Sequence, residues 1–409
     1  MILEFKIQNF LSFKNEVTFS FEATKDKTHE DYYVTEVAPG VKILRFGIVY
    51  GANASGKSNL IKAFDFIREI ARELPNDREK ETGFIPFLFG NSAREPGHFE
   101  LTFYIQAVKF IYSISVDKNI IYNEKLQYYP GTQPAVIFDR FYDKDKDVSV
   151  IEFGNKIKIP KSVKELITGY TLNNTSVIAA TKQVNFTIPA MHNVREWFKK
   201  QFLPPVFPPG FGKGIGIIEY TNRNIKINDE LKKFTIDFLK NAEYNITDIL
   251  YKTENQEGSD EKIGKLEFEH IVNQKGEICK YKLAEQFQSA GALRYYGFSA
   301  PLYKLFNSNG FLPVDEIESS LHPILVNHLI RYFLVQSQQC KNVQFLATTH
   351  NISLLNEKDL LRKDAIWFTE KQEDGSTELY SMAEFDIRKE LSYYNAYKTG
   401  KFGAVPFLK

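Results

Sequence analysis

Cysteine is scarce in this sequence of 409 residues. Cys279 and Cys340 are the only two, they lie 61 positions apart, and neither belongs to a Cys-x-x-Cys pair. A disulfide framework and a zinc site built from paired cysteines are therefore excluded. Sparing use of cysteine is typical of proteins in a reducing cytosol, so we expect a cytoplasmic protein.

Net charge is close to zero as well. Lys and Arg together number 52 and Asp and Glu 51, which gives a formal charge of +1. Proteins that coat nucleic acid carry a clear basic surplus, so that class is excluded, although a local basic patch stays open. No run approaches the roughly 18 uninterrupted apolar residues of a membrane span, so we expect no membrane association. Residues 1–7 alternate apolar and polar side chains, which predicts a strand rather than a signal peptide.

Aromatic residues, in contrast, are abundant. They make up 14% of the chain, with 35 Phe and 22 Tyr against 2 Trp. Hydrophobic residues at 43% and charged residues at 25% are typical of a soluble globular protein. We expect most of the aromatic side chains to lie in a core. A C-terminal group is open to a second interpretation, as a partner interface: Tyr393, Tyr394, Tyr397, Phe402 and Phe407.

Hydrophobic periodicity divides the chain into three parts. Residues 1–154 predict an N-terminal lobe of short antiparallel strands around one helix at about 57–73. Residues 155–261, polar and interrupted by Pro and Gly, predict an inserted helical or mixed subdomain. In residues 262–409 strands alternate with helices, which predicts a parallel sheet.

The expected elements follow from the same patterns. The remaining predicted helices lie at about 190–202, 229–241 (with Asp229 as N-cap), 291–306, 322–336 and 352–356. The predicted strands lie at 1–7, 17–21, 99–105, 108–116, 120–128, 135–142, 265–271, 311–315 and 343–348, and residues 253–260 read as an exposed loop.

The strongest functional signal is the run Gly51-Ala52-Asn53-Ala54-Ser55-Gly56-Lys57-Ser58, which fits GxxxxGK[ST]. It lies between an apolar run and a predicted helix. Glycines let backbone N–H groups surround a phosphate, Lys57 would contact the β and γ phosphates, and Ser58 would bind Mg²⁺. We predict a nucleotide-binding loop here, with Asn59 beside it; the alternative is a glycine turn that carries a surface lysine.

A nucleotide-hydrolysing site also needs a carboxylate for the metal and a group that activates water. Two apolar runs end in Asp. The first ends at Asp139 and is followed by Arg140, whereas the second ends at Asp315 and is followed by Glu316. The second run supplies Asp315 as the predicted Mg²⁺ ligand and Glu316 as the predicted general base. The alternative is a solvated acidic turn.

Two more positions carry candidate chemistry. His350 follows the predicted strand 343–348, where it would reach a γ-phosphate or the attacking water, unless it is an ordinary surface or core histidine. Ser289 and Gly291 open a predicted helix. Ser289 either caps that helix or presents its hydroxyl and the positive helix end to a phosphate from another subunit.

The order of these motifs resembles the ABC-type ATPase heads of SMC, Rad50 and RecF proteins. It is most similar to bacterial AAA-type ATPases related to the overcoming-lysogenization-defect (OLD) nucleases, which include ATPase subunits of abortive-infection systems. The resemblance covers about 1–150 and 262–409. It rests on these runs: Ile7–Phe13, Gly51–Ser58, Asp315–Glu318 leading into Ser320–Pro323, Thr348–His350, and Tyr397–Pro406.

The resemblance implies an α/β fold, namely an ABC-type P-loop ATPase head with an antiparallel β subdomain and an inserted region. It implies ATP and Mg²⁺ as ligands and hydrolysis by Glu316, His350 and Lys57. It further implies a homodimer, or a higher homo-oligomer, in which each nucleotide lies between the P-loop of one chain and Ser289 and Gly291 of the other. Residues 319–322 would then lie near the dimer interface.

The resemblance also bears on partners. Only 59 residues follow His350, too few for the Toprim nuclease domain of the full-length OLD nucleases, so a nuclease or toxin effector would be a separate chain. Three functions stay open. One is an ATPase that serves as sensor or scaffold in antiphage defence, with residues 155–261 facing its partner. Another is a RecF-like DNA-maintenance ATPase, which the charge disfavours. The third is a protein that ATP merely holds together, which Glu316 disfavours.

Overall fold

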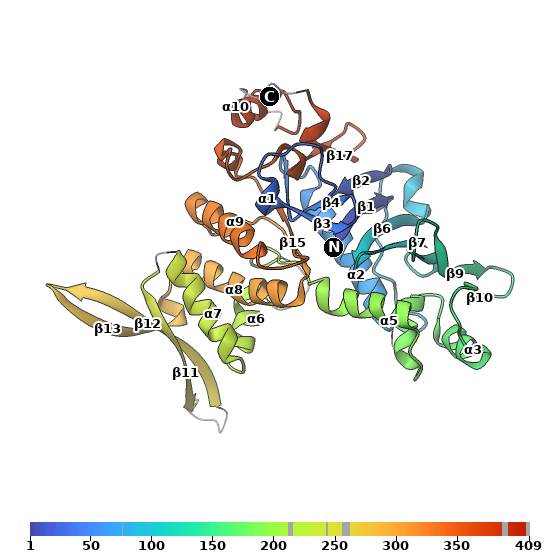
Figure 1. The fold of residues 1–409 in the computed structure, drawn as a ribbon, viewed down its shortest axis with the longest axis horizontal. Coiled ribbons are helices and arrows are strands. Elements are labelled where there is room, and N and C mark those ends of the chain that lie inside the picture. Colours follow the sequence, from blue (N-terminus) through green and yellow to red (C-terminus); the bar gives the residue numbers. More distant parts are fainter. Residues whose placement is uncertain (76, 212–215, 243, 256–261, 387–391, 406–409) are drawn as a thin grey trace.

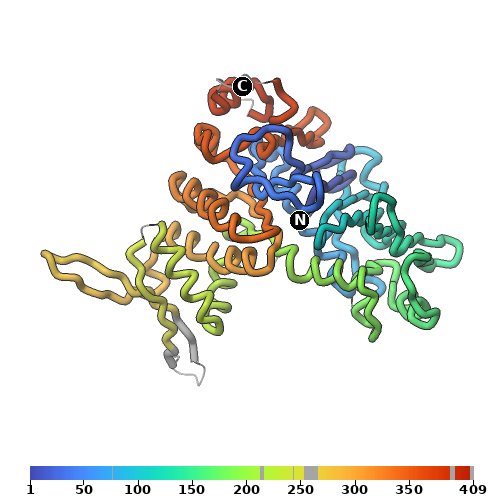
Figure 2. The backbone as a smooth tube through the Cα atoms, in the orientation of Figure 1, coloured from blue at the N-terminus to red at the C-terminus, as the bar shows by residue number. Residues whose placement is uncertain are grey.

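The chain folds into a central body from which a narrow arm projects (Figures 1 and 2). A computed structural model describes residues 1–409 apart from 76, 212–215, 243, 256–261, 387–391 and 406–409. Two large sheets form the body, one mostly parallel and one antiparallel. The predicted α/β class, with a P-loop core and an antiparallel β subdomain, is confirmed.

The five-stranded sheet holds the functional motifs. Its order is β14-β15-β5-β16-β17, with parallel pairing everywhere except between β16 and β17. Every residue of β5, β14 and β15 is buried, as expected for parallel strands covered on both faces. The strands are β5 (Phe46–Gly51), β14 (Phe311–Val314), β15 (Gln344–Thr348), β16 (Ile366–Lys371) and β17 (Thr377–Ser381).

The seven-stranded sheet is antiparallel throughout, in the order β10-β9-β8-β7-β6-β1-β2. Its strands alternate between buried and more exposed residues, because one face packs on the body and the other faces solvent. The strands are β1 (Ile2–Gln8), β2 (Val17–Ser20), β6 (Gly97–Ile105), β7 (Val108–Val116), β8 (Ile121–Tyr129), β9 (Ala135–Asp143) and β10 (Val148–Phe153).

Helix α2 (Lys57–Arg72) joins the two sheets through an aromatic core. Its Phe64 ring lies 4.6 Å from the ring of Phe5 in β1 and 5.1 Å from that of Phe311 in β14. The ring of Phe202 lies 6.2 Å from that of Phe64 and 5.2 Å from that of Phe311. Much of the aromatic surplus is therefore accounted for by one core that fixes the P-loop helix between the sheets.

Residues 155–261 pack in two separate places. Helices α3 (Lys161–Tyr170), α4 (Val177–Ala180) and α5 (Pro189–Glu196) pack beside the antiparallel sheet and α2. Helices α6 (Ile217–Ile225) and α7 (Asp229–Asn241) pack instead on α8 (Ala290–Ser308). Figure 1 shows these two groups on opposite sides of the molecule. The three-part division stays a prediction, but β11 pairs with β12 across its second boundary.

The arm is a three-stranded antiparallel sheet, β11-β12-β13, at the far left of Figure 1. Its strands are β11 (Ile246–Asn255), β12 (Lys262–Gln274) and β13 (Glu277–Ala284). Phe268 anchors the base of the arm against Tyr296 of α8, with ring centroids 5.2 Å apart. Farther out, Ile278 is 73% exposed, so the distal arm has no packing partner within the described chain.

Helix α8 contains a proline in its interior, Pro301. Proline has no backbone N–H, so the carbonyl of Gly297 lacks its helical donor. Thr221 Oγ1 of α6 donates to that carbonyl at 2.9 Å instead. A side chain on Gly297 would lie 2.9 Å from Ile217, so glycine also permits the close approach of α6.

The remaining elements complete the body. They are α1 (Glu30–Tyr33), α9 (Pro323–Ser337), α10 (Tyr393–Lys398), β3 (Val34–Ala38), β4 (Val41–Leu44), the short 3₁₀ turns η1 (Gly90–Arg94), η2 (Thr181–Gln183), η4 (Glu285–Phe287), η5 (Ile352–Asn356), η6 (Lys363–Ala365) and η7 (Met382–Glu384), and the π-helical turn η3 (Trp197–Gln201). None of the helices in the described part of the chain has the length and apolarity that a membrane crossing requires.

Several sequence predictions need correction. Asn228, not Asp229, caps α7, because its Oδ1 accepts the N–H of Leu231 at 2.9 Å. The predicted helix at 352–356 is one 3₁₀ turn. Residues 253–255 of the predicted loop belong to β11, and the rest of that loop lies outside the described residues.

The C-terminal aromatic group belongs mainly to the core. Tyr397 and Phe402 are 5% and 1% exposed and stack on Phe368 of β16. The Tyr397 hydroxyl donates to Ala404 O at 2.8 Å, which fixes the tail on the sheet. Phe407 lies outside the described residues. This packing leaves little of the group free for a partner.

Candidate nucleotide-binding site

The carboxyl ends of three neighbouring parallel strands bring the predicted residues together. The P-loop follows β5, Asp315 and Glu316 follow β14, and His350 lies two residues beyond the end of β15. Ligands bind at this edge of open α/β sheets, because loops leave every strand on the same side. Residues separated by about 300 positions in the sequence thus share one site.

Glycines shape the P-loop between β5 and α2. Gly56, at the N-cap of α2, has φ of 109°, a conformation that favours glycine. A side chain there would lie 2.3 Å from Thr377 Oγ1, and one on Gly51 would lie 2.4 Å from Ser55 Oγ. Both positions therefore require glycine. The loop ends at the N-terminus of a 16-residue helix, where backbone N–H groups favour an anion.

Hydroxyl side chains from segments distant in the sequence hold the P-loop and the start of α2 by hydrogen bonds. Thr377 Oγ1 donates to Ser55 O at 2.8 Å, and Ser55 Oγ lies 2.6 Å from Thr369 Oγ1. Ser12 Oγ accepts from Asn59 Nδ2 at 2.8 Å, so the N-terminal loop contacts α2 directly. Sequence reasoning missed Thr369 and Thr377 and gave Ser12 no role of its own, because hydroxyl residues in strands and turns carry no signal before the fold is known.

The side chain of Lys57 folds back onto the P-loop and contacts its backbone. Its side chain is buried, and Nζ donates to Gly51 O at 2.9 Å and to Ala52 O at 3.0 Å. Burial lowers the pKa of Lys57 to about 8, and the charges of Asp315, Glu318 and Glu316 only partly oppose that shift. The third nearby partner of Nζ is His350 Nδ1 at 3.4 Å, so a phosphate oxygen that binds Lys57 would take the place of one of these partners.

Asp315 is held by the end of β15. Thr348 Oγ1 donates to Asp315 Oδ1 at 2.6 Å and accepts the backbone N–H of Glu316 at 2.8 Å. Asp315 is only 4% exposed, and its own N–H donates to Val206 O at 2.8 Å. Thr348 therefore orients both predicted acidic residues at once.

Glu316 and His350 face each other beside Lys57. His350 Nε2 lies 3.9 Å from Glu316 Oε1, and His350 Nδ1 lies 3.4 Å from Lys57 Nζ. Burial, followed by the charges of Asp315 and Glu318, raises the pKa of Glu316. Burial and then the Lys57 charge lower the pKa of His350, so this imidazole is neutral near pH 7. The site thus joins a base of raised pKa to a neutral histidine.

Glu318 holds the backbone at His350 by hydrogen bonds. Its carboxylate accepts the backbone N–H of His350 and, at 2.8 Å, the hydroxyl of Thr349. Sequence reasoning included Glu318 only as part of an acidic run. Glu316 itself has a left-handed backbone conformation, with φ of 46°. Glu316 and Glu318 therefore serve different partners, His350 Nε2 and the backbone N–H of His350, while the charge of Glu318 still acts on Glu316.

Ser289, Ala290 and Gly291, called the signature segment from here on, lie at the start of α8, at the edge of this site. Ser289 Oγ caps α8 by accepting the N–H of Ala292 at 3.1 Å, and Ser289 itself is exposed. A side chain on Gly291 would lie 3.1 Å from Ser320 O, so the signature packs beside the segment that follows Glu316. Within the described chain, neither Ser289 nor Gly291 contacts the P-loop by a hydrogen bond. Their predicted role toward a second subunit stays a prediction.

Arg294, one turn into α8, was not assigned a role from the sequence. It is 2% exposed, and its NH1 group donates to Phe207 O at 3.1 Å. Its Nε and NH2 groups have no hydrogen-bond partner among the described residues. Burial lowers the pKa of Arg294 to about 10, while the charge of Glu316 opposes that shift. Arg294 thus provides an electrostatic link between the signature helix and the predicted base.

The residues present fit ATP and Mg²⁺. The glycine cradle admits no side chain at Gly51 or Gly56, and the N-terminus of α2 favours phosphate. Ser58 and Asp315 offer a hydroxyl and a carboxylate, which are ligands that Mg²⁺ prefers alongside phosphate oxygens and water. Among the described residues no group of three or more His, Cys, Asp and Glu could hold a metal ion by itself.

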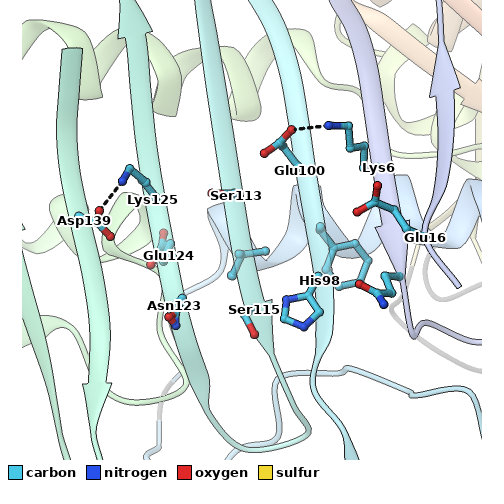
Figure 3. Close-up of a pocket in the computed structure, with 13 residues that line it drawn as sticks. Lys6, Glu16, His98, Glu100, Ser113, Ser115, Asn123, Glu124, Lys125 and Asp139 are labelled. Carbon is cyan, nitrogen blue, oxygen red and sulfur yellow. Dashed lines mark hydrogen bonds and ion pairs between the residues drawn. The ribbon is translucent and has the colours of Figure 1, made fainter. Parts of the chain in front are cut away.

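A polar cavity of about 550 Å³ lies elsewhere, on the open face of the antiparallel sheet (Figure 3). Its charged side chains already form pairs, with Lys6 3.0 Å from Glu100 and Lys125 2.5 Å from Asp139. Asp139, the alternative candidate for the Mg²⁺ ligand, therefore forms an ion pair with Lys125 in an antiparallel sheet. This cavity offers no unpaired charge cluster for a nucleotide.

Comparison with protein families decides the affiliation. Residues 47–356, more than half of the chain, match the family described as AAA domain, putative AbiEii toxin, Type IV TA system. The chain belongs to this family. The match begins within β5 and ends within η5, so in this AAA-domain protein it includes the P-loop, the signature segment, Asp315, Glu316 and His350.

Solved structures with a similar arrangement are SMC heads. The SMC head domain from Thermotoga maritima is 13% identical, with a TM-score of 0.46, and the similarity covers 94% of this chain and 99% of that one. The Smc head domain from Pyrococcus furiosus, solved with an extended coiled coil bound to the C-terminal domain of ScpA, is 12% identical, with a TM-score of 0.41 and 98% of each chain covered. Comparison with curated proteins finds no match.

Proposed function

We propose that this AAA-domain protein is a Mg²⁺-dependent ATPase that dimerises around ATP and serves as sensor or scaffold for a separate effector. One observation carries the proposal. Lys57, His350 and Glu316 form a continuous series at the edge of the sheet, with 3.4 Å between the first pair and 3.9 Å between the second. A phosphate-binding cation thus lies beside a histidine and a carboxylate suited to activating water.

Each residue has a separate task. The backbone N–H groups of the P-loop and Lys57 would bind phosphate oxygens, and Ser58 and Asp315 would hold Mg²⁺, which would supply charge neutralisation for the phosphates. Glu316 accepts the proton of the attacking water, and its raised pKa makes it a stronger base than an exposed carboxylate. Neutral His350 orients that water or a γ-phosphate oxygen through a ring nitrogen.

The position of the signature segment supports the proposed dimer. Ser289 is exposed at the N-terminus of a 19-residue helix, the kind of site that binds an anion presented from outside the chain. In the proposed dimer, Ser289 and Gly291 of one chain contact the nucleotide held by the P-loop of the other. Hydrolysis then requires both chains.

The role in defence is supported by the family description, which names an AbiEii-type toxin and a type IV toxin–antitoxin system. We propose an abortive-infection or related antiphage function, with a nuclease or toxin as effector. A plaque assay tests it: cells that carry the gene with its neighbouring genes should lower phage plating efficiency, and Glu316→Gln should remove that protection. Equal plating with and without the gene would count against this role.

Substitution of Glu316 tests the chemistry. We expect Glu316→Gln to bind ATP, to lower kcat by about 100-fold or more, and to accumulate as an ATP-bound dimer in sedimentation, because the base alone is removed. Glu165→Gln, at an exposed helix position far from the site, is the matched control and should hydrolyse ATP normally. Unchanged hydrolysis by Glu316→Gln would remove this residue from the base role.

Mixed dimers test the shared site. We expect Lys57→Ala to lose ATP binding and Ser289→Arg to keep binding while losing hydrolysis. Combining the two variants should restore activity to about one site per mixed dimer, because one composite site then contains an intact P-loop and an intact signature. Failure to restore any activity would contradict the composite site.

A further inference from the structure

A second pocket, outside the ATP site, has the character of an anion site. Its volume is about 730 Å³, within the range of ligand pockets, and it lies between the π-helical turn η3 and helices α6, α7 and α8. Cationic and amide side chains dominate its wall, and its lining residues include no Asp or Glu. This composition differs from the cavity of Figure 3, whose cations are paired with carboxylates.

Two lysines supply the charge from opposite walls. Lys199 belongs to η3 and Lys304 to α8, and in the described part of the chain neither forms an ion pair with a carboxylate. Lys200 also lines the pocket but is paired with Glu196 at 2.7 Å. Lys199 and Lys304 therefore remain available to an anion that enters between them.

The surroundings of Lys304 are electropositive. Partial burial lowers its pKa, and the charges of Arg68 and Arg72 at the end of α2 lower it further. Arg68 is itself buried and donates through Nε to Phe202 O at 2.9 Å. Arg68 is also paired with Asp65 and Glu69, and Arg72 with Glu69. The groups offered to an anion are therefore the two lysines without an ion pair among the described residues, Lys199 and Lys304, and a bound phosphate would offset the repulsion that Lys304 experiences from the arginines.

Neutral donors complete the wall. Asn228 and Asn307 line the pocket and supply amide groups. Asn224 and Tyr303 line it as well, but Asn224 Nδ2 donates to Tyr220 O at 2.8 Å and the Tyr303 hydroxyl donates to Glu230 at 2.9 Å. Amide groups and lysines from several elements are the combination that positions phosphate in nucleic-acid complexes. The turn that supplies Lys199 is π-helical, a rare conformation often found at functional positions.

We propose that this pocket is a second phosphate-binding site, which receives a phosphate ester of nucleic acid or of a free nucleotide between Lys199 and Lys304. The site is distinct from the P-loop, since it lies at the C-terminal end of the helix that begins at Lys57. Its presence reconciles a net charge of +1 with binding of a polyanion, because the basic groups are local.

Binding is measured in a Lys57→Ala background, so that neither the P-loop nor the proposed hydrolysis contributes. The probes are fluorescein-labelled single-stranded and double-stranded DNA oligonucleotides, read by anisotropy over a salt series, and unlabelled AMP, read by calorimetry. We expect Lys199→Ala combined with Lys304→Ala to weaken binding by about tenfold or more. For oligonucleotides the salt slope should also fall by about 2.

Controls separate the site from general charge loss. Lys146→Ala combined with Lys161→Ala removes two lysines that are 73% and 91% exposed elsewhere, and should leave binding unchanged. Arginine at both pocket positions should retain binding. Loss confined to oligonucleotides assigns the site to nucleic acid, and loss confined to AMP assigns it to a free nucleotide. If the double alanine variant binds every probe as its parent does, or as the control does, the proposal is overturned.

Discussion

Lys57 holds its ammonium group where water hydrates it poorly. Two carbonyl groups of its own loop accept its hydrogen bonds, yet burial lowers its pKa from 10.5 to about 8. A shift of this size corresponds to about 3 kcal/mol of cost for the charged form near neutral pH, at about 1.4 kcal/mol per pKa unit. The residue that we predict to bind phosphate therefore destabilises the nucleotide-free fold.

Replacement of this lysine separates stability from function. We expect Lys57→Met to raise the free energy of unfolding of the nucleotide-free protein by about 1 kcal/mol, because it removes about 3 kcal/mol of charge cost and loses about 2 kcal/mol from two hydrogen bonds. Its Tm should rise accordingly, and ATP binding should be abolished. Calorimetric scans with and without ATP measure both effects. Lys62→Met, on an exposed position of the same helix, should leave ATP binding intact and give no such gain. A lower Tm for Lys57→Met would contradict this account.

The same lysine predicts a pH dependence. The folded-state pKa of Lys57 lies below its unfolded value, so between about pH 8 and 10.5 the unfolded chain binds more protons than the folded one. The Lys57 contribution to the free energy of unfolding should therefore rise with pH over this window. Denaturant titrations should show the advantage of Lys57→Met shrinking as pH rises from 8 to 10.5, and a constant difference would rule out this titration.

At the scale of elements, the end of β15 orders the end of β14. Thr348 uses one hydroxyl to donate to Asp315 and to accept from the backbone of Glu316. The Thr348 hydroxyl that bonds Asp315 and the backbone N–H of Glu316 is shielded from water, since Thr348 is fully buried. The parallel register of the two strands thus sets the positions of the predicted metal ligand and the predicted base.

Removal of that hydroxyl should impair catalysis more than binding. We expect Thr348→Val to lower the free energy of unfolding by about 1–3 kcal/mol, because it leaves a buried donor and a buried acceptor unpaired. It should lower kcat by about 10-fold to 100-fold through misplacement of Glu316, with a smaller change in ATP affinity. Thr348→Ser keeps the hydroxyl and should retain most activity. Equal activity of the valine and serine variants would contradict the positioning role.

Much of this region was predictable from the sequence. Strand periodicity, the glycine-lysine loop and the Asp315-Glu316 pair are local patterns, and α2, β7 and α7 fall within one residue of their expected bounds. The supports were not predictable. Thr369 and Thr377 act through contacts across more than 300 positions, and threonine in a strand is ordinary in any β protein.

Other misses have equally physical causes. The pocket at Lys199 and Lys304 required the approach of segments about 100 positions apart, and its charges vanish in a whole-chain total. The tail aromatics form the same pattern in a core or at an interface, and only the stacking on Phe368 decides between them. Adjacent Asn228 and Asp229 are both good caps, so the sequence left the choice to one hydrogen bond.

At the scale of the whole molecule, the arm and the signature are neighbours in the chain. The strand β13 ends at Ala284, η4 follows, and Ser289 is the N-cap of α8. A short turn therefore connects the projecting sheet to the proposed dimer contact. The distal arm is exposed, whereas its base is anchored on α8. The arm is therefore carried by the same helix that would contact a second nucleotide.

Hydrogen exchange tests this arrangement. We expect ATP added to Glu316→Gln to slow amide exchange at residues 285–295 and 51–59, because the dimer buries both segments. The distal arm, about 270–280, should exchange at an unchanged rate. Lys57→Ala with ATP is the control and should show neither effect. Unchanged exchange at 285–295 in Glu316→Gln would count against a dimer formed through the signature.

Pro301 removes one backbone hydrogen bond inside the helix α8, and Thr221 of α6 donates to the carbonyl of Gly297 that loses its donor. The piece before it carries Ser289 and the piece after it carries Lys304. The two ends of α8 are therefore connected through one interior stretch, where Pro301 interrupts the backbone hydrogen bonds and α6 contacts the helix.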